Sequence, residues 1–385
     1  MSKDMFKMLV PSKSDARQLL RQSTDDLDED CSRFDFGILP NLTVTSPNTF
    51  EIEDKQCTVI AELGRGEFGI VLEAIDQHGL SVAVKFMFGE DQAAQRSELS
   101  MQYWLSCMLK EKPPPTGAAL VPEIYTIANY QKGRQCLELI GDQATSCIVG
   151  VMEMVGSELS ELVKNSIGNA KKAPIVRQVL KDVAMTLLHV NALSVRPAFV
   201  HGDLHESNVM YKQREDGTYQ FYILDLGYGE LKQHGVLKQP TDFYQNRAQT
   251  TNGFRNIGSV GNDLCTLCFS IAGQFSSSNI NLPQLWKPIS DILKLKQNEE
   301  SLGLEIQHHF LNRKSDFFLG CKSYDKKWPL QYQDEDGTSK PLLLAHALCY
   351  DDGDADPDIA EIFEPGHFLA TYITPYESSL GCAIA

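Results

Sequence analysis

Residue types able to bind phosphate groups and a divalent cation occur in one order along this 385-residue chain. Glycines let backbone amides approach phosphates closely, and a lysine supplies a compact positive charge. Carboxylate and amide oxygens are the ligands that Mg²⁺ accepts. Transfer of a phosphoryl group from a nucleotide requires these types together. In chain order they are the glycine segment Gly64–Gly69, Lys85, Glu98, the pair Asp203 and Asn208, and Asp225.

The glycine segment follows the pattern G-x-G-x-x-G-x-V, with Gly64, Gly66, Gly69 and Val71 at the fixed positions. In a dinucleotide-binding fold such a segment would follow a strand and open a helix. Here a β-like run follows it, then a turn and another β-like run. This order favours a hairpin whose backbone lies over phosphate groups, although an ordinary hairpin with glycine turns remains an alternative.

The next β-like run contains Val82-Ala83-Val84-Lys85. Strand alternation places Ala83 and Lys85 on one face, where the small Ala83 leaves room for an adenine ring. Glu98 lies 13 residues after Lys85, inside a helix expected over residues 91–110. We therefore expect a Lys85–Glu98 ion pair that fixes the ammonium group. A surface lysine at the end of a strand is the alternative.

Two further segments carry acidic residues in a distinctive context. Residues 201–208 are H-G-D-L-H-E-S-N, and residues 223–227 are I-L-D-L-G. They fit, with changes, the H-R-D-L-x-x-x-N and D-F-G motifs. Together with the glycine segment and the lysine strand, they give the chain a clear resemblance to the protein-kinase family over roughly residues 55–275. A metal site built from His201, Asp203 and His205 is the rival interpretation.

The resemblance implies a role for each matching residue. Asp203 would accept or orient the proton of the substrate hydroxyl, with Lys85 and Glu98 completing the catalytic set. Asn208 and Asp225 would bind Mg²⁺, so ATP and Mg²⁺ are the expected cofactors. Asp263, near the start of a buried helix, resembles the aspartate that braces the catalytic loop.

The resemblance also implies a fold and a hinge. The fold would be α+β and bilobal, with a small antiparallel β-sheet lobe that carries one key helix and a larger, mainly helical lobe. Met152 would be the gatekeeper beside the adenine, and the backbones of Glu153 and Val155 would bond to it. The expected divisions are a polar N-terminal tail over 1–50, the small lobe and hinge over 51–155, the large lobe over 156–345, and a C-terminal extension over 346–385.

Departures from the family pattern qualify the expected mechanism. Gly202 replaces the arginine that pairs with a phosphorylated activation loop, and no A-P-E motif follows. We therefore expect activity that does not depend on activation-loop phosphorylation. Gln102 replaces an apolar residue one helical turn after Glu98, which leaves the packing behind that helix open. His205, at a position that helps to set the acceptor, resembles haspin-like and other divergent kinases, and serine or threonine is favoured over tyrosine.

Two other functions stay open. A small-molecule kinase of the aminoglycoside- or choline-kinase type also carries H-G-D-L followed by asparagine. His201 follows Glu153 by only 48 positions, which leaves little room for the substrate-binding helices usual in that type, so a protein hydroxyl is the favoured acceptor. A pseudokinase scaffold would typically lack Lys85, Asp203 or Asp225, all of which are present.

Composition bounds the partners and the compartment. The net charge of −16 argues against nucleic acid as a main partner and leaves a protein substrate. The ten cysteines are scattered, which suits a reducing cytosol, and the Cys265 and Cys268 pair lies in an apolar run expected to be buried core. The last four residues, from Cys382, fit a farnesylation signal. One lipid would add only weak membrane association, in a native or invaded eukaryotic cytosol.

Overall fold

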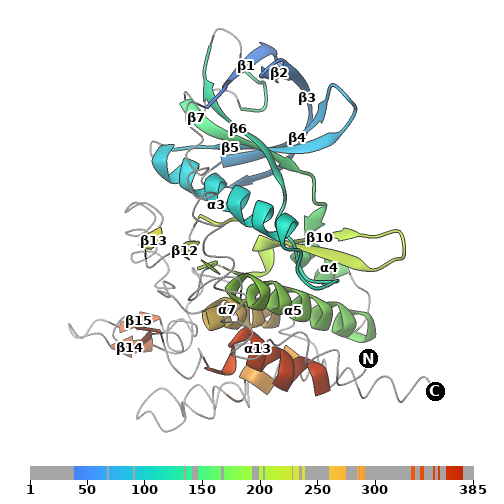
Figure 1. Ribbon diagram of the computed structural model, residues 1–385, viewed down its shortest axis with the longest axis vertical. Helices are drawn as coiled ribbons and strands as arrows, with labels where there is room; N and C mark the ends of the chain where they lie inside the picture. The colour runs from blue at the N-terminus through green and yellow to red at the C-terminus, as the bar shows by residue number, and fades with distance from the viewer. Residues whose placement is uncertain are drawn as a thin grey trace.

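The computed structural model shows a mixed α+β protein with a strand-rich N-terminal part and a helical C-terminal part (Figure 1). The structure describes residues 39–66, 69–89, 92–133, 136–140, 146–165, 169–192, 199–202, 204–227, 229–233, 236–238, 260–274, 284–285, 287–289, 291, 331–333, 339–341, 350–351, 354–355 and 361–375.

Seven strands close into a barrel in the order β1-β2-β3-β4-β5-β7-β6. Neighbouring strands are antiparallel, except that β1 pairs with β6 in parallel. The sequence predicted an antiparallel sheet, and the closure and the parallel pair correct this. The strands are β1 Asn41–Ser46, β2 Thr49–Ile52, β3 Lys55–Gly66, β4 Gly69–Asp76, β5 Ser81–Met87, β6 Ile124–Gln131 and β7 Ser146–Glu153.

Alternating side chains fill the barrel. Along β5, Val82, Val84 and Phe86 point into the barrel interior, whereas Ala83 and Met87 belong to a second cluster outside it. The rings of Phe50 and Tyr130 pack edge-on against Phe86, with ring centroids 6.5 and 5.7 Å away. Phe50 of β2 is fully buried here, so strands β1 and β2 belong to the barrel although they fall within the segment 1–50 that was expected to be a polar tail.

Helix α3, Gln92–Glu111, lies against the outside of the barrel (Figure 1). Leu99 is fully buried and fits over Gly150 of β7. A Cβ atom added to Gly150 would lie 2.7 Å from Leu99 Cδ2, so the absence of a side chain there allows the helix to approach the sheet. This contact sets the distance between α3 and the strands β5 and β7.

The connection after α3 ties the helix to the rest of the protein. Leu120 donates from its amide to the Phe221 carbonyl, and its carbonyl accepts from the Ile223 amide. The Thr186 hydroxyl donates to the Ala119 carbonyl at 2.6 Å. The chain that leaves α3 is therefore bonded both to the strand Tyr219–Ile223 (β11) and to the helix Asn169–Ala192 (α5).

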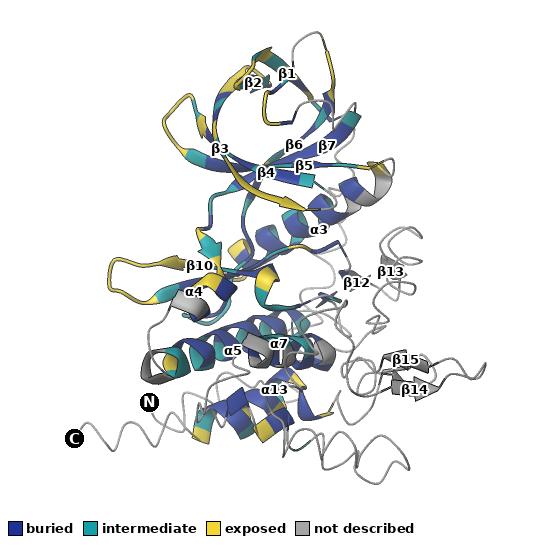
Figure 2. Ribbon diagram, turned by 180° about the vertical axis from the view of Figure 1, so that it is seen from behind, coloured by how far each residue is buried: buried dark blue, intermediate teal, exposed yellow. Residues whose placement is uncertain are grey.

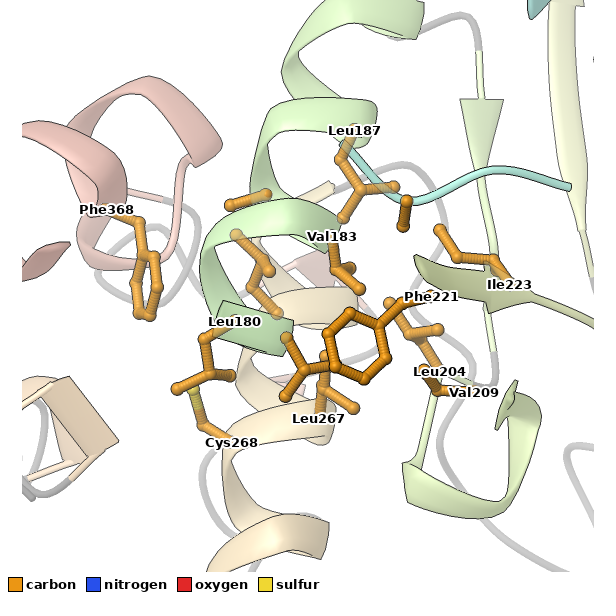
Figure 3. Close-up of a cluster of buried hydrophobic side chains, with 14 of the residues drawn as sticks. Leu180, Val183, Leu187, Leu204, Val209, Phe221, Ile223, Leu267, Cys268 and Phe368 are labelled. Carbon is orange, nitrogen blue, oxygen red and sulfur yellow. The ribbon is translucent and has the colours of Figure 1, made fainter. Parts of the chain in front are cut away.

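The helical part is built around α5 (Figure 3). Leu180, Val183 and Leu187 of α5 meet Phe221 of β11 and Leu267 of α7, all of them buried. Figure 2 shows this interior mostly as buried ribbon. The helices are α4 Leu159–Asn165, α5, α7 Val260–Gln274 and α13 Pro365–Phe368, with a 3₁₀ turn η2 Glu206–Asn208 and a π-helical turn η3 Leu369–Ile373.

Short strands complete the described part. They are β8 Ser157–Glu158, β9 Phe199–Val200, β10 Val209–Gln213, β11, β12 Glu230–Gln233, β13 Val236–Lys238, β14 Gln331–Gln333, β15 Ser339–Pro341, β16 Tyr350–Asp351 and β17 Asp354–Ala355. The hairpin of β10 and β11 carries the residues that lead directly into Asp225.

The buried residues of this core bear on two expectations from the sequence, the C-x-x-C pair and the C-terminal extension. Cys265 and Cys268 are buried in α7, as their apolar surroundings predict, and burial raises the pKa of the Cys268 thiol. The C-terminal extension is different, because residues 361–375 are part of the core. Phe363 and Phe368 are fully buried, and α13 and η3 pack against α5. In the stretches described, no helix combines the length and apolarity needed to span a membrane.

Candidate functional site

The four residues of the glycine motif occupy the β3–β4 hairpin with different surroundings. Gly64 pairs with Val71, and Gly66 pairs with Gly69. No atom lies within 4 Å of a Cβ built on Gly64 or Gly66, so this part of the hairpin is open. A Cβ on Gly69 would instead overlap the Phe86 carbonyl oxygen. Gly69 therefore serves the close packing of β4 on β5, whereas Gly64 and Gly66 leave backbone accessible to a ligand.

Lys85 and Ala83 lie on the same face of β5, the face that looks away from the barrel interior. Lys85 pairs in register with Val71, and Ala83 pairs with Met152. The Lys85 Nζ atom lies 2.5 Å from Glu98 Oε1. This is the ion pair expected from the sequence, and it links the strand to α3.

Three charged groups meet at this point. A Cβ atom on Gly227 would lie 3.1 Å from Glu98 Oε2 and 3.4 Å from Asp225 Oδ1, so both carboxylates border the same glycine. Burial raises the pKa of Glu98 above its ordinary value, with Lys85 opposing the shift and Asp225 adding to it. Desolvation would also raise the pKa of Asp225, but Lys85, then His201 and His205, outweigh it and lower that pKa. Lys85 thus holds two carboxylates that would otherwise repel each other.

The backbone around Asp225 is unusual. Its φ angle is 58°, which is uncommon outside glycine and better tolerated by aspartate than by most residues. The preceding residue, Leu224, donates from its amide to the Asn208 carbonyl at 2.9 Å. Asn208 itself ends the turn η2, where its amide donates to the His205 carbonyl at 3.0 Å. These bonds place Asn208 beside the chain that carries Asp225.

Asp263 of α7 holds the segment before Asn208 through hydrogen bonds to its backbone. Its carboxylate accepts from the His201 amide at 2.8 Å and from the Gly202 amide at 2.9 Å. Gly202 has a φ angle of 79°, a conformation that glycine adopts without strain, so the bend at this point suits glycine. Asp203, the predicted catalytic residue, lies outside the described residues. Its described neighbours on both sides, Gly202 and Leu204, are held by this brace and by the core.

His201 is a structural member of this group. Its Nε2 atom lies 2.7 Å from the Leu224 carbonyl oxygen, which can only accept, so Nε2 carries hydrogen. Burial lowers the pKa of His201 from 6.5 to about 4. Asp203 lies outside the described residues, so the rival metal site of His201, Asp203 and His205 stays a prediction. Within the described ranges, no group of three or more His, Cys, Asp or Glu side chains is arranged to hold a metal ion.

The predicted hinge follows β7. Met152 and Val155 are buried, 5% and 4% exposed. The Glu153 amide donates to the Glu123 carbonyl at 2.8 Å, so this amide is already bonded within the protein. The Glu153 side chain accepts from the Tyr222 hydroxyl at 3.2 Å, and burial raises the pKa of that hydroxyl to about 12.

The sequence did not indicate a role for Tyr222 or for Gln95 of α3, because neither residue belongs to a recognisable motif. Both are buried polar residues that bond to other elements. No motif marks them, because the contacts that bury them come from residues more than fifty positions away. Cys382, the predicted lipid site, lies outside the described residues.

Comparison with known proteins gives likenesses in structure and none in sequence. No family model matches the chain, and no curated protein matches it in sequence. A solved structure described as vaccinia related kinase 3 is similar with a TM-score of 0.46 and 11% identity, over 88% of this chain and 92% of that chain. What the site can do follows from its own geometry.

Proposed function

We propose that this protein is an ATP-dependent protein kinase of a divergent, bilobal kinase-like type. The observation that carries the proposal is the joining of Lys85, Glu98 and Asp225 in one charged group beside Asn208. These are the residue types that bind nucleotide phosphates and a divalent cation, and they come from four separate elements. The preferred acceptor is a serine or threonine hydroxyl of a protein.

Each residue has a distinct task in this proposal. Lys85, held by Glu98, places a positive charge where the phosphates of ATP would lie. Asp225 and Asn208 supply hard oxygen ligands of the kind that Mg²⁺ prefers, and the lowered pKa keeps Asp225 ionised. When bound, Mg²⁺ would neutralise charge on the phosphates. Asp203 orients the acceptor hydroxyl for in-line attack on the γ-phosphoryl group.

The adenine would bind on the same face of β5, against Ala83. Ala83 and Met152 pair across β5 and β7, and both belong to the cluster outside the barrel. Beside them, the Glu153 carbonyl and the Val155 backbone would bond to the edge of the ring. The open backbone at Gly64 and Gly66 would approach the phosphates from above.

Activity should not require phosphorylation of an activation loop. Gly202 has no side chain with which to bind a phosphate, and the bend at its φ angle of 79° suits glycine. The Lys85–Glu98 pair is formed without any such phosphate. A protein kinase with these features would be active as synthesised.

The deciding experiment measures transfer of label from γ-labelled ATP, with Mg²⁺, to a eukaryotic cell lysate separated into proteins and small molecules. Wild type is compared with Lys85→Met and Asp225→Asn. Lys110→Met is the matched control, because Lys110, on the helix α3 that also carries Glu98, forms an exposed ion pair of 2.7 Å with Glu123. Label in protein bands that both site variants lose and the control keeps supports the proposal.

The other outcomes separate the competing functions. Label confined to small molecules would replace the protein kinase with a small-molecule kinase. No transfer by wild type, together with binding of ATP, would indicate a pseudokinase scaffold. Loss of label after treatment of the purified protein with a phosphatase would contradict independence from phosphorylation.

A further inference from the structure

Helix α3 buries several polar side chains, and three of them form or flank the ion pair with Lys85. Gln95, Glu98 and Gln102 are 2%, 5% and 3% exposed. Their spacing of three and four residues places them in one row along the helix. A buried amide is unfavourable unless it is hydrogen-bonded, so the contacts of the two glutamines must be accounted for.

Gln95 bonds to backbone on both sides of its amide. Its Nε2 donates to the Gly89 carbonyl at 3.1 Å, and its Oε1 accepts from the Ile148 amide at 3.0 Å. The pairing of β5 with β7 ends at Phe86 and Val149, so Ile148 is the next residue along β7. The Gln95 side chain therefore bonds to the β7 backbone just beyond the point where the pairing of β5 with β7 ends.

Gln102 makes the corresponding contact one helical turn beyond Glu98. Its Nε2 donates to the Pro122 carbonyl at 3.3 Å and lies 3.6 Å from the Met152 sulfur. Pro122 precedes β6, and Met152 is the last residue but one of β7. The two glutamines thus bond α3 to the backbone of the barrel on both sides of Glu98.

We propose that Gln95 and Gln102 are positioning residues that fix α3 by their amides, so that Glu98 reaches Lys85 without an outside partner. This rests on the proposed function, in which the Lys85–Glu98 pair serves phosphoryl transfer. Apolar contacts such as Leu99 on Gly150 set the distance of the helix from the sheet, but they allow it to slide or rotate. Directional hydrogen bonds to backbone atoms prevent both movements.

The hydrogen bonds of Gln95 and Gln102 oppose a movement that the burial of Glu98 would otherwise favour. Glu98 is only 5% exposed, so a movement of α3 that turned its carboxylate out into water would restore the hydration of that charge. Each buried hydrogen bond opposes that movement. Three amide bonds to backbone are available for this.

The test replaces the amides by a side chain of the same length without them. Gln95→Met, Gln102→Met and the double variant are compared with wild type. Gln178→Met is the matched control, because Gln178 of α5 also donates an amide to a backbone carbonyl, that of Tyr219 at 3.0 Å. Gln178 lies 80 positions after Glu98 in the sequence, on the helix α5 of the helical part and not on α3.

We expect kcat to fall about threefold to tenfold in each single variant and further in the double variant, with KM for ATP nearly unchanged, because tenfold in rate corresponds to about 1.4 kcal/mol. The control keeps its kcat. A loss of general stability would instead lower the amount of active enzyme equally in the control. Equal kcat in the double variant and wild type would overturn the proposal.

Two measurements need no activity and keep the inference separate from the proposed function. Hydrogen exchange should become faster in the peptides that contain residues 92–101 and Ile148 in Gln95→Met but not in Gln178→Met. Acylation of Lys85 by acetic anhydride, followed by mass spectrometry, should become faster in the double variant, with Lys110 as an internal standard. Unchanged exchange and acylation would overturn the inference, even in a protein that proved to be an active kinase. Faster exchange and acylation in a protein without kinase activity would support the positioning role and refute only the proposed function.

Discussion

Protonation of His201 should destabilise the folded protein as the pH falls. Burial lowers the pKa of this ring to about 4, against 6.5 for an exposed histidine. Between these values the unfolded chain binds more protons than the folded one, so the free energy of unfolding decreases with decreasing pH. The stability that the neutral ring contributes is present above about pH 6.5 and is lost on acidification towards about pH 4.

The two pKa values set the magnitude. One pKa unit corresponds to about 1.4 kcal/mol, so the full effect is about 3 kcal/mol. Linkage at a single site gives a loss of about 2 kcal/mol between about pH 7.5 and about pH 5. The carboxylates of the protein add their own pH dependence, so the effect of His201 must be isolated by a variant.

The variant is His201→Gln, whose amide can still donate to the Leu224 carbonyl but does not titrate. Denaturation by urea, followed by tryptophan fluorescence, gives the free energy of unfolding of both proteins at each pH. The advantage of wild type over the variant should shrink by about 2 kcal/mol between about pH 7.5 and about pH 5. His189→Gln measures the background of losing one histidine, since its Nε2 also lies near a carbonyl, that of Lys112 at 2.8 Å. Curves for wild type and His201→Gln that stay parallel over this range would show that His201 is not held neutral by burial.

Three further substitutions probe the packing, and thermal unfolding measures each. Gly150→Ala places a Cβ atom 2.7 Å from Leu99 Cδ2, and should cost about 1–3 kcal/mol and lower turnover, because the buried Leu99 side chain, or α3 with it, must shift. Phe368→Ala should cost about 3–5 kcal/mol if the C-terminal segment is part of the core, and a loss below about 1 kcal/mol would contradict that. Tyr130→Phe should be neutral or stabilising, because the Tyr130 hydroxyl is buried without a hydrogen-bond partner among the described residues. A clear loss of stability in Tyr130→Phe would reveal a partner.

Residues with a local pattern were the ones that the sequence predicted well. Strand alternation placed Ala83 and Lys85 on one face, and helical periodicity placed Glu98 within reach of Lys85. The brace from Asp263 to the His201 and Gly202 amides was also expected. In each case a short motif restricts the backbone enough to set the direction of the side chain.

Contacts between distant segments were not predictable in this way. The strand Asn41–Ser46 looks like part of a polar tail until its pairing with Asn129 and Tyr130 is known. Phe363 and Phe368 follow a long polar stretch, and nothing near them in the sequence shows that α5 covers them. Gln95 looks like an ordinary helix former, because its two bonds go to Gly89 and Ile148, which the helix alone does not specify.

Closure of the barrel has a consequence for association. A closed barrel has no edge strand, and an edge strand offers unpaired amides and carbonyls to a strand of another molecule. The parallel pair of β1 with β6 is the closing contact, with Asn41 opposite Asn129 and Leu42 opposite Tyr130. A chain that began at residue 51 would lack this seam and would expose β3 and β6 as new edges. The first strand therefore protects the protein from intermolecular strand pairing and aggregation, a task that is separate from any chemistry at Lys85 and Asp225.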